Sequence, residues 1–386
     1  MTYCKICGKW DCEEHQFNLG KTVSIKEFSG SSPPEIFVGK WNYPNVYAGI
    51  LSPTQYGDTR ILSSSEIWHE KKLPIHEIVS LRQKLIYGRS RTHIKKRDDR
   101  FLSVMKEVAM THKSVATEFK LKSPVKQNPE REPNSPLISR VVFVQNVSLL
   151  ENPSVKSKVD YLVNDTEAKS KTAMLELEKS NIDTSSIIKL LSAGLLGLKK
   201  NRKLVPTKWA ITAVDDTLSK NKLKKIRYFN EISEIQLFNA EYLGNHYEFL
   251  LLPDKFSFEV IEISLTNLGV WRDYESFFDR KSYAEDVSGA YYVNRLALTE
   301  YLEKIKRQAS CIVFREIRPE YNTPMGVGIL RETSREAFSQ KPQRFNTIPE
   351  ALNAIQSRLK LPINNFTQNS IILKNYGKQK RLSEFL

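Results

Sequence analysis

Cysteine is scarce in this chain, and long apolar runs are absent. Four cysteines occur among 386 residues, and three of them lie within the first dozen positions. So few thiols, gathered at one end, exclude a disulfide framework as the basis of the fold. No apolar stretch is long enough for a membrane-spanning helix, and residues 1–4 show neither the basic start nor the apolar core of a signal peptide. The sequence therefore predicts a cytoplasmic protein without a membrane partner.

Acidic residues are outnumbered by basic ones. The chain has 44 Asp and Glu residues against 59 Lys and Arg residues, a formal net charge of +15 with an isoelectric point near 9.4. This excess favours contact with a polyanion, although charge alone indicates association and not chemistry. With 40% hydrophobic residues the chain can bury a sizeable core, and its length indicates about two domains.

The N-terminal cysteines form a pattern with one histidine. Two residues separate Cys4 from Cys7, and two separate Cys12 from His15. Each pair can hold one ion from a tight turn, and three thiolates with one imidazole make a closed tetrahedral set for structural zinc. No coordination position is left open for catalysis, so the zinc would stabilise a knuckle over residues 1–18. Whether this knuckle also contacts DNA stays open.

A loop rich in turn-forming residues separates two short β-prone runs, residues 36–38 and 46–51. Within it, Lys40, Trp41 and Tyr43 combine positive charge with aromatic rings. Such a loop could stack on a base or contact a phosphate. It could equally be an ordinary packed surface loop.

A helix is predicted over residues 74–87, and a dense run of cations follows it. This run could follow a phosphate backbone, or it could be a solvated helix face. The predicted DNA-binding residues here and further along the chain are Arg89, Arg91, Lys95, Lys96, Arg97, Arg202 and Lys203. Residues 120–137 are rich in Pro, Glu, Asn, Ser and Lys, which is typical of a flexible loop.

The segment 202–216 begins with basic residues and continues into an apolar run that we interpret as a buried strand. Its end carries Asp215 and Asp216, where open sheets present functional groups. Together with Glu259 or Glu262 these carboxylates could hold magnesium for nuclease chemistry. Acids at a strand end could also simply cap helices or pair with nearby lysines. The first interpretation makes Asp215 and Asp216 candidate catalytic residues.

A second set of candidate catalytic residues lies in the C-terminal part of the chain. It comprises Tyr291 in a small-residue turn that opens a helix, Arg315 and Glu316 at a strand end, and Arg331 and Glu332 beyond it. These residues would suit a pocket for a nucleotide or NAD, as in a nucleotidyl or ADP-ribosyl transferase. They could instead form a structural ion-pair network. No standard catalytic fingerprint occurs, so whether the protein is an enzyme stays open.

Short motifs upstream and downstream accompany the segment 202–216. They are Phe37-Val38-Gly39, Tyr43-Pro44, Gly289-Ala290-Tyr291-Tyr292 and Arg315-Glu316. Over nearly the whole chain, this set resembles the archaeal DNA repair protein family NreA. The resemblance implies a zinc knuckle, an N-terminal region at 19–270, a C-terminal region at 271–370 and a tail at 371–386. It further implies repair of damaged DNA in partnership with the sliding clamp, without an agreed reaction.

The last residues of the tail resemble the clamp-binding box, or PIP motif, of replication and repair proteins. Leu382, Phe385 and Leu386 fall at i, i+3 and i+4, so one helical turn would gather them into an apolar plug. Gln379 would hydrogen-bond a separate small pocket. Burial of each large side chain contributes about 1.5–3 kcal/mol. The alternative is a tail that packs on its own domain.

Further strands are predicted at residues 249–252, 256–263 and 311–317, with Cys311 as a core residue. The last helix is predicted to begin with a capping box of Thr347 and Glu350, and residues 364–370 are predicted as a linker. Helices and strands mix along the chain without a regular βαβ order, which predicts an α+β fold with a mixed sheet and surrounding helices. The favoured function is a DNA damage repair protein that the clamp PCNA recruits and that binds DNA through basic surfaces. The alternative is a DNA- or nucleotide-modifying enzyme.

Overall fold

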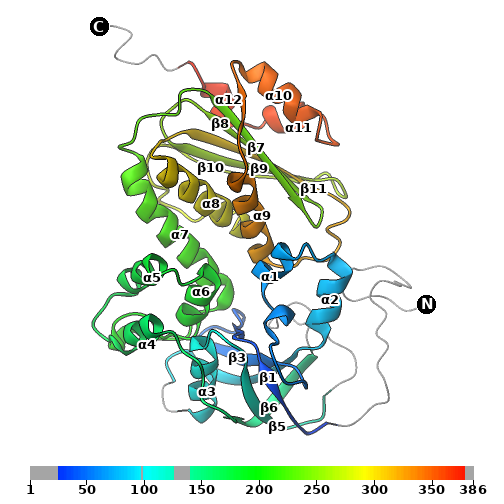
Figure 1. Cartoon of the computed structure of the whole chain (residues 1–386), viewed down its shortest axis with the longest axis vertical. Coiled ribbons are helices and arrows are strands. Elements are labelled where there is room, and N and C mark those ends of the chain that lie inside the picture. The colour runs from blue at the N-terminus through cyan, green and yellow to red at the C-terminus, as the bar shows by residue number, and fades with distance from the viewer. Residues whose placement is uncertain (1–24, 97–98, 126–139, 379–386) are drawn as a thin grey trace, which may run out of the picture. The chain divides into compact units, whose positions relative to one another are not determined.

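The computed structural model describes residues 25–96, 99–125 and 140–378 (Figure 1). Within it the chain forms two compact units. Unit 1 extends to Thr217 and includes Thr323–Met325, and unit 2 comprises Leu218–Asn322 and the chain from Gly326 onward. None of the described helices has the length and apolar character needed to cross a bilayer. The zinc-knuckle residues and the clamp-binding box lie outside the described residues.

Unit 1 is built on a six-stranded mixed sheet of order β1-β5-β6-β4-β3-β2. Its strands are β1 (Glu27–Ser32), β2 (Ile36–Val38), β3 (Asn45–Ser52), β4 (Ile86–His93), β5 (Val115–Leu121) and β6 (Arg140–Leu149). β4 and β6 pair in parallel, whereas the other neighbours are antiparallel. The strands predicted at 36–38 and 46–51 are confirmed as β2 and β3.

Short helices surround this sheet. They are α1 (Ser65–Glu70), α2 (Ile75–Gln83), α3 (Arg100–Met110), α4 (Ser157–Asn164), α5 (Ser170–Lys179) and α6 (Thr184–Ser192), with single 3-10 turns η2 (Arg60–Leu62) and η3 (Lys199–Asn201). α3 and α6 begin at aspartates, because the side chains of Asp99 and Asp183 each accept a hydrogen bond from a free backbone N–H of the first turn. The helix predicted over 74–87 ends at Gln83, and residues 86 and 87 already belong to β4.

α7 (Thr207–Ile226) is a single long helix, so the strand predicted within 202–216 is wrong. Ala210, Val214 and Leu218 are buried at spacings of four residues, which is a helical period. The β-branched residues Ile211 and Thr212 suggested a strand, but the segment buries side chains with the period of a helix. The boundary between units 1 and 2 falls inside this helix.

Unit 2 is built on a second six-stranded mixed sheet, of order β10-β9-β11-β8-β7-β12. Its strands are β7 (Ile235–Tyr242), β8 (Asn245–Leu252), β9 (Ser257–Ser264), β10 (Val270–Glu275), β11 (Ser310–Ile317) and β12 (Gln343–Phe345). Only β9 and β11 pair in parallel among the described strands of this sheet. The strands predicted at 249–252, 256–263 and 311–317 are confirmed, and two mixed sheets with helices confirm the α+β class.

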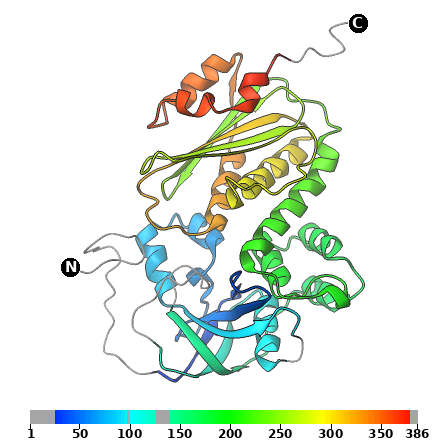
Figure 2. The ribbon, with the colours of Figure 1, turned by 180° about the vertical axis from the view of Figure 1, so that it is seen from behind.

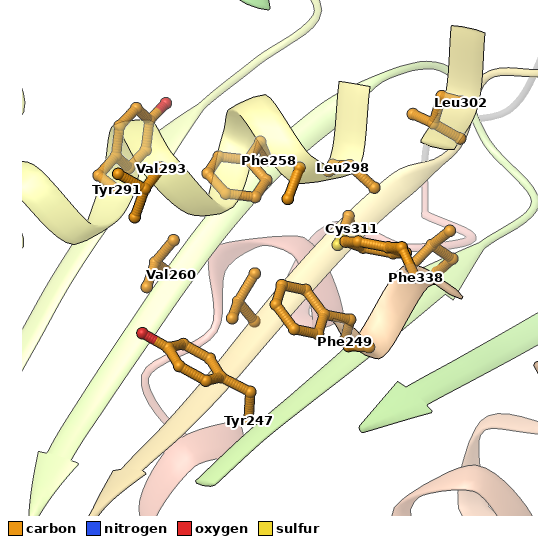
Figure 3. Packing of buried hydrophobic residues seen from close by; sticks show 14 of the residues in the cluster. Tyr247, Phe249, Phe258, Val260, Tyr291, Val293, Leu298, Leu302, Cys311 and Phe338 are labelled. Carbon is orange, nitrogen blue, oxygen red and sulfur yellow. The ribbon is translucent and has the colours of Figure 1, made fainter. Parts of the chain in front are cut away.

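Helices cover both faces of the unit 2 sheet (Figures 1 and 2). α8 (Gly289–Ile305) and α9 (Val327–Ser339) pack on one face, where Phe249, Phe258 and Cys311 form part of a large core (Figure 3). α10 (Ile348–Gln356), α11 (Asn364–Thr367) and α12 (Ile371–Asn375) cover the other face. The prediction that Cys311 is a core residue is confirmed, and burial raises the pKa of its thiol.

The C-terminal helices are fixed by specific contacts. The capping box predicted at Thr347 and Glu350 is present at the start of α10. The stretch 364–370, predicted as a linker, instead contains α11, because Phe366 is fully buried with its ring centre 5.7 Å from that of Phe314. Burial of this aromatic side chain stabilises the segment on the sheet by removing apolar surface from water, which a solvated linker does not do.

Candidate nucleic-acid interface

The loop between β2 and β3 has a well-defined backbone. Asn42 adopts a left-handed φ of 62°, and the Tyr43–Pro44 peptide bond is cis. The Pro44 carbonyl accepts a hydrogen bond from the Ile94 N–H at 3.0 Å, which ties the loop to the end of β4. Trp41 and Tyr43 remain 50% and 40% exposed. The loop therefore holds two aromatic side chains at the surface of unit 1.

The start of α7 is attached to the same region. Leu204 donates its backbone N–H to the Ile94 carbonyl at 2.9 Å, and the Thr207 hydroxyl accepts from the Val38 N–H at 2.9 Å. These bonds place Trp209, in the first turn of α7, beside the loop. Residues distant in the sequence are thus brought to one surface.

Tyr43 and Trp209 form an exposed aromatic pair. Their ring centres are 5.1 Å apart with an angle of 53° between the planes, and Trp209 is 46% exposed. The Lys203 ammonium lies 3.3 Å from the Tyr43 hydroxyl. The Lys40 ammonium lies 4.8 Å from the centre of the Trp41 ring. Aromatic faces with adjacent lysines are typical of surfaces that stack on nucleobases and attract phosphates.

A cationic cavity of about 180 Å³ is lined in part by Lys203, the residue whose ammonium contacts the Tyr43 hydroxyl. Its cationic lining residues are Lys96, Lys106, Lys199, Arg202 and Lys203, beside apolar Ile94, Leu195 and Leu204. Among the described residues that line it there is no carboxylate, although Lys96 also pairs with Asp99 at 2.5 Å. A recess with several cations and little acid favours a bound anion.

The cavity wall depends on one glycine and one arginine. Gly194, just after α6, has a φ of 70°, and a Cβ there would lie 2.6 Å from the Lys203 carbonyl oxygen. Arg202 donates to the carbonyls of Val163, Asp165 and Gly197 at 2.7–2.8 Å. Arg202 therefore holds the surrounding backbone in place as well as lining the cavity.

The predicted DNA-binding cations are not all at the surface. Exposed among them are Arg91, Lys95, Lys96 and Lys203. Arg89 is only 4% exposed, and its guanidinium lies 4.2 Å and 4.9 Å from the ring centres of Tyr47 and Phe143. It packs inside unit 1, where it does not suit contact with a phosphate. Arg97 lies outside the described residues.

The predicted catalytic residues of unit 2 belong to an ion-pair network and not to a shared pocket. Arg315 pairs with Glu262 at 2.7 Å on the α8 and α9 side of the sheet. Glu316, the next residue of β11, points to the opposite face, where it accepts from the backbone N–H groups of Lys360 and Leu361. Successive strand residues face opposite sides of a sheet. The predicted nucleotide or NAD pocket is therefore not assembled from Arg315 and Glu316.

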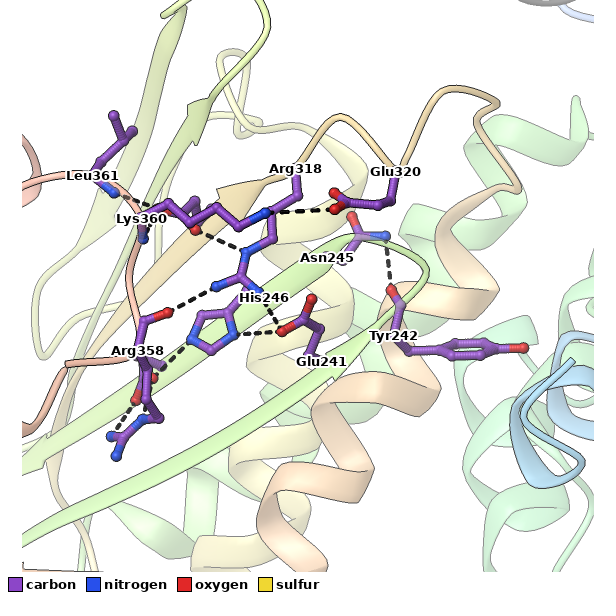
Figure 4. Close-up of polar contacts among 11 residues, drawn as sticks. Glu241, Tyr242, Asn245, His246, Arg318, Glu320, Arg358, Lys360 and Leu361 are labelled. Carbon is purple, nitrogen blue, oxygen red and sulfur yellow. Dashed lines mark hydrogen bonds and ion pairs between the residues drawn. The ribbon is translucent and has the colours of Figure 1, made fainter. Parts of the chain in front are cut away.

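On the face of the unit 2 sheet that α10, α11 and α12 cover, ion pairs attach the end of α10 to the sheet (Figure 4). His246 lies between Glu241 and Glu248, with ring nitrogens 3.1 Å and 2.9 Å from their carboxylates. Arg358, just beyond α10, donates to both oxygens of Glu248 at 2.7 Å and 2.9 Å. Arg318 contacts Glu241 and Glu316. The carboxylates are thus engaged in holding the fold together.

The remaining candidates are also dispersed. Tyr291 is fully buried, and burial raises the pKa of its phenol, so the group stays protonated at neutral pH. Glu332 pairs with Arg335 at 3.0 Å, and Arg331 is 2% exposed on α9.

The predicted magnesium site is not formed among the described residues. Asp215 and Asp216 lie on α7, within a helix and not at a strand end. Glu262 pairs with Arg315, and Glu259 accepts hydrogen bonds at the start of α12. No group of three or more His, Cys, Asp or Glu side chains within the described ranges could hold a metal ion. Within the described residues, the carboxylates that the nuclease interpretation requires are therefore not gathered at one site.

Sequence reasoning missed part of the interface. The loop of Tyr43 and the segment of Trp209 were both singled out, but nothing in the sequence indicated that these side chains pack together. Lys106 and Lys199 were missed as well. Lys199 could have been found from the sequence, because it begins the run of basic residues that continues to Lys203. Lys106 had no such signal, because it is a single lysine within α3.

Comparison with known families decides the relationship of this chain. The model for archaeal Nre, N-terminal, matches residues 1–271, and the model for archaeal Nre, C-terminal, matches residues 275–385. The chain belongs to the archaeal Nre family. The two matches meet at β10, inside the unit 2 sheet, whereas the compact units part within α7. The N-terminal match therefore includes part of unit 2.

Three relatives extend over most of this chain. DNA repair protein NreB of Archaeoglobus fulgidus is 34% identical over 96% of this chain and 95% of its own length. DNA repair protein NreA of the same organism is 31% identical, over 92% of this chain and 91% of its own. DNA repair protein NreA of Haloferax volcanii is 29% identical, over 93% and 89%. No solved structure matches the fold. The resemblance noted from the sequence motifs is confirmed.

Proposed function

We propose that this Nre protein acts in DNA repair, that it binds DNA through the interface of unit 1, and that a sliding clamp recruits it. Its relatives are named DNA repair proteins. The observation that carries the proposal is the joined surface of Tyr43, Trp209 and Lys203 beside the cationic cavity. A net charge of +15 adds long-range attraction to DNA.

The clamp and zinc parts of the proposal rest on sequence pattern. Gln379, Leu382, Phe385 and Leu386 would bind PCNA as a short helical turn. Three thiols and one imidazole at the N-terminal end suit tetrahedral zinc, which would stabilise the knuckle as a structural cofactor.

DNA binding is tested with the full-length protein and a fluorescent DNA, by measuring anisotropy over a salt series. We expect the logarithm of the association constant to fall steeply and linearly with the logarithm of salt concentration, because lysines and arginines release counterions from phosphates. Replacing Lys203 by Gln should lower the affinity, whereas Lys281→Gln, an exposed site in unit 2, should not. Absence of DNA binding at low salt would overturn this part.

Clamp recruitment is tested by titration calorimetry against PCNA. We expect binding of roughly micromolar strength, and the double substitution Phe385→Ala with Leu386→Ala should abolish it because it removes the apolar plug. Lys374→Ala, which stands before the box, serves as the matched control. Equal binding by the double variant and the unchanged protein would contradict recruitment through the box.

A further inference from the structure

Unit 1 places a stacking surface directly beside a site for negative charge. Tyr43 packs on Trp209, and the Lys203 ammonium joins the Tyr43 hydroxyl to the cationic cavity. A ligand that uses both features needs a flat ring and, a short distance away, an anionic group. One nucleotide unit of a nucleic-acid strand has both. The preferred form of DNA is therefore one that presents a base ring and a phosphate to this surface together.

We infer that this surface recognises single-stranded DNA, with an unpaired base stacked on Tyr43 and Trp209 and a backbone phosphate at the cationic cavity. This rests on the proposed function, which supplies DNA as the ligand. Aromatic side chains can stack only on a base whose face is exposed, and a duplex keeps its bases in its own stack. The substrate class is thus DNA with unpaired bases, such as a gap, a flap or an opened lesion site.

The size of the cavity agrees with this assignment. At about 180 Å³ it can admit a phosphate group with its water, but not a double helix. Duplex readers instead project a helix or ribbon into a groove about 12 Å wide. Recognition by stacking and charge involves no base-edge hydrogen bonds, so we expect little sequence preference.

The aromatic pair is also held ready for binding. Ile94 accepts from the Leu204 N–H and donates its own N–H to the Pro44 carbonyl, so both segments that carry the rings are attached to the same residue. A surface whose backbone is fixed in advance loses little conformational entropy on binding. The Leu204 bond also fixes the backbone next to Lys203, whose ammonium contacts the Tyr43 hydroxyl.

The decisive experiment compares two labelled probes, an oligothymidine strand and a blunt duplex of equal length, by anisotropy with the full-length protein. Trp209→Ala should weaken single-strand binding about 5- to 150-fold, the effect of losing one stacked base, and change duplex binding less than about twofold. Trp209→Phe should retain most of the affinity because it keeps an aromatic face. The single strand should quench the tryptophan fluorescence of the unchanged protein, and this quenching should be smaller in Trp209→Phe.

A matched control is available in the same unit. Tyr161 is 62% exposed, and the Lys158 ammonium lies 5.4 Å from the centre of its ring, so it is also an exposed aromatic beside a lysine. Tyr161→Ala should leave binding of both probes unchanged. Lys203→Gln should reduce the salt slope for the single strand by about 0.7, the value for one phosphate contact.

The outcomes separate this inference from the proposed function. If the unchanged protein binds neither probe, both fall. If it binds DNA but Trp209→Ala weakens the two probes equally, or weakens neither, DNA binding stands and the single-strand assignment is overturned. If Trp209→Ala lowers the melting temperature of the protein, the binding comparison uses Trp209→Leu instead, because leucine keeps apolar contact without offering a stacking face.

Discussion

At Gly194 the fold leaves no space for a side chain. The residue has a φ of 70°, in the left-handed region that glycine adopts at little cost, and the Lys203 backbone passes directly over its Cα. The close approach sets the position of the segment that carries Lys203 and leads into α7. A residue without a side chain thus shapes the cationic cavity.

Replacing Gly194 by Ala should destabilise the protein, because the new Cβ would lie 2.6 Å from a backbone oxygen that cannot move freely. Gly57→Ala is the matched control, since Gly57 also has a positive φ, of 108°, but has open space around it. We expect Gly194→Ala to lower the free energy of unfolding by about 2 kcal/mol more than Gly57→Ala. Urea denaturation measures both, and equal losses would contradict the steric argument.

Arg89 and Arg91 show how neighbouring cations on one strand differ. Arg89 packs against the adjoining rings of Tyr47 and Phe143 and contributes cation–π attraction and apolar contact along its stem. Arg91 is exposed near the end of β4. The first therefore stabilises unit 1, whereas the second remains a predicted DNA contact.

Arg89→Ala should lower the free energy of unfolding by about 2–3 kcal/mol, because it empties a buried site beside two rings. Arg91→Ala should change stability by less than about 0.5 kcal/mol but reduce the salt slope of DNA binding by about 0.7–0.9. Thermal melting and anisotropy distinguish the two variants. A lower salt slope with unchanged stability in Arg89→Ala would contradict its placement in the interior.

In unit 2, one buried carboxylate accepts the hydrogen bonds at the start of α12. Glu259, fully buried on β9, accepts hydrogen bonds from the Ser370 hydroxyl at 2.6 Å and from the N–H groups of Ile371 and Ile372 at 2.7 Å and 3.1 Å. Backbone N–H groups at a helix start have no partner within the helix. The carboxylate therefore attaches the last described helix to the sheet.

Glu259→Ala should lower the free energy of unfolding by about 2–4 kcal/mol, because it leaves buried donors without an acceptor. Amide exchange at Ile371 and Ile372 should accelerate more than exchange in β8 or β11. Glu285→Ala, an exposed glutamate of the same unit, is the control and should change neither quantity. Protected amides in Glu259→Ala would show that α12 is held by its apolar contacts alone.

For the whole molecule, the proposed functions lie in different parts of the chain. The DNA interface belongs to unit 1, whereas the proposed zinc ligands lie within residues 4–15 and the clamp-binding box within residues 379–386. Among the candidate carboxylates of unit 2, Glu262, Glu316 and Glu332 pair with arginines, and Glu259 accepts hydrogen bonds at the start of α12.

Metal analysis of the full-length protein should find about one zinc ion per chain, held by thiolates and one imidazole. Cys12→Ser should lose the zinc, since a closed tetrahedral site needs all its ligands. Cys311→Ala should retain it, because that cysteine is buried in the core of unit 2. Zinc retained by Cys12→Ser, or lost by Cys311→Ala, would contradict the proposed ligand set.

Local patterns in the sequence were enough to predict many elements. The strands around residues 249–252 and 311–317, the helix beginning near Gly289 and the capping box of α10 depend on apolar periodicity and on neighbouring residues. The start of α7 was misjudged because β-branched residues obscured its helical burial pattern. The buried α11 was missed for a similar reason, since its polar composition hides one deeply packed phenylalanine.

By itself, the sequence determined the family, the α+β class, the basic charge and the candidate zinc and clamp motifs, since these depend on composition and on residues close together in the chain. Only the tertiary structure decided which charges are available. It buried Arg89, turned Arg315 and Glu316 to opposite faces of β11, and brought Tyr43 against Trp209. Those outcomes depend on contacts between residues far apart in sequence, which strand pairing and helix packing set and no local pattern records.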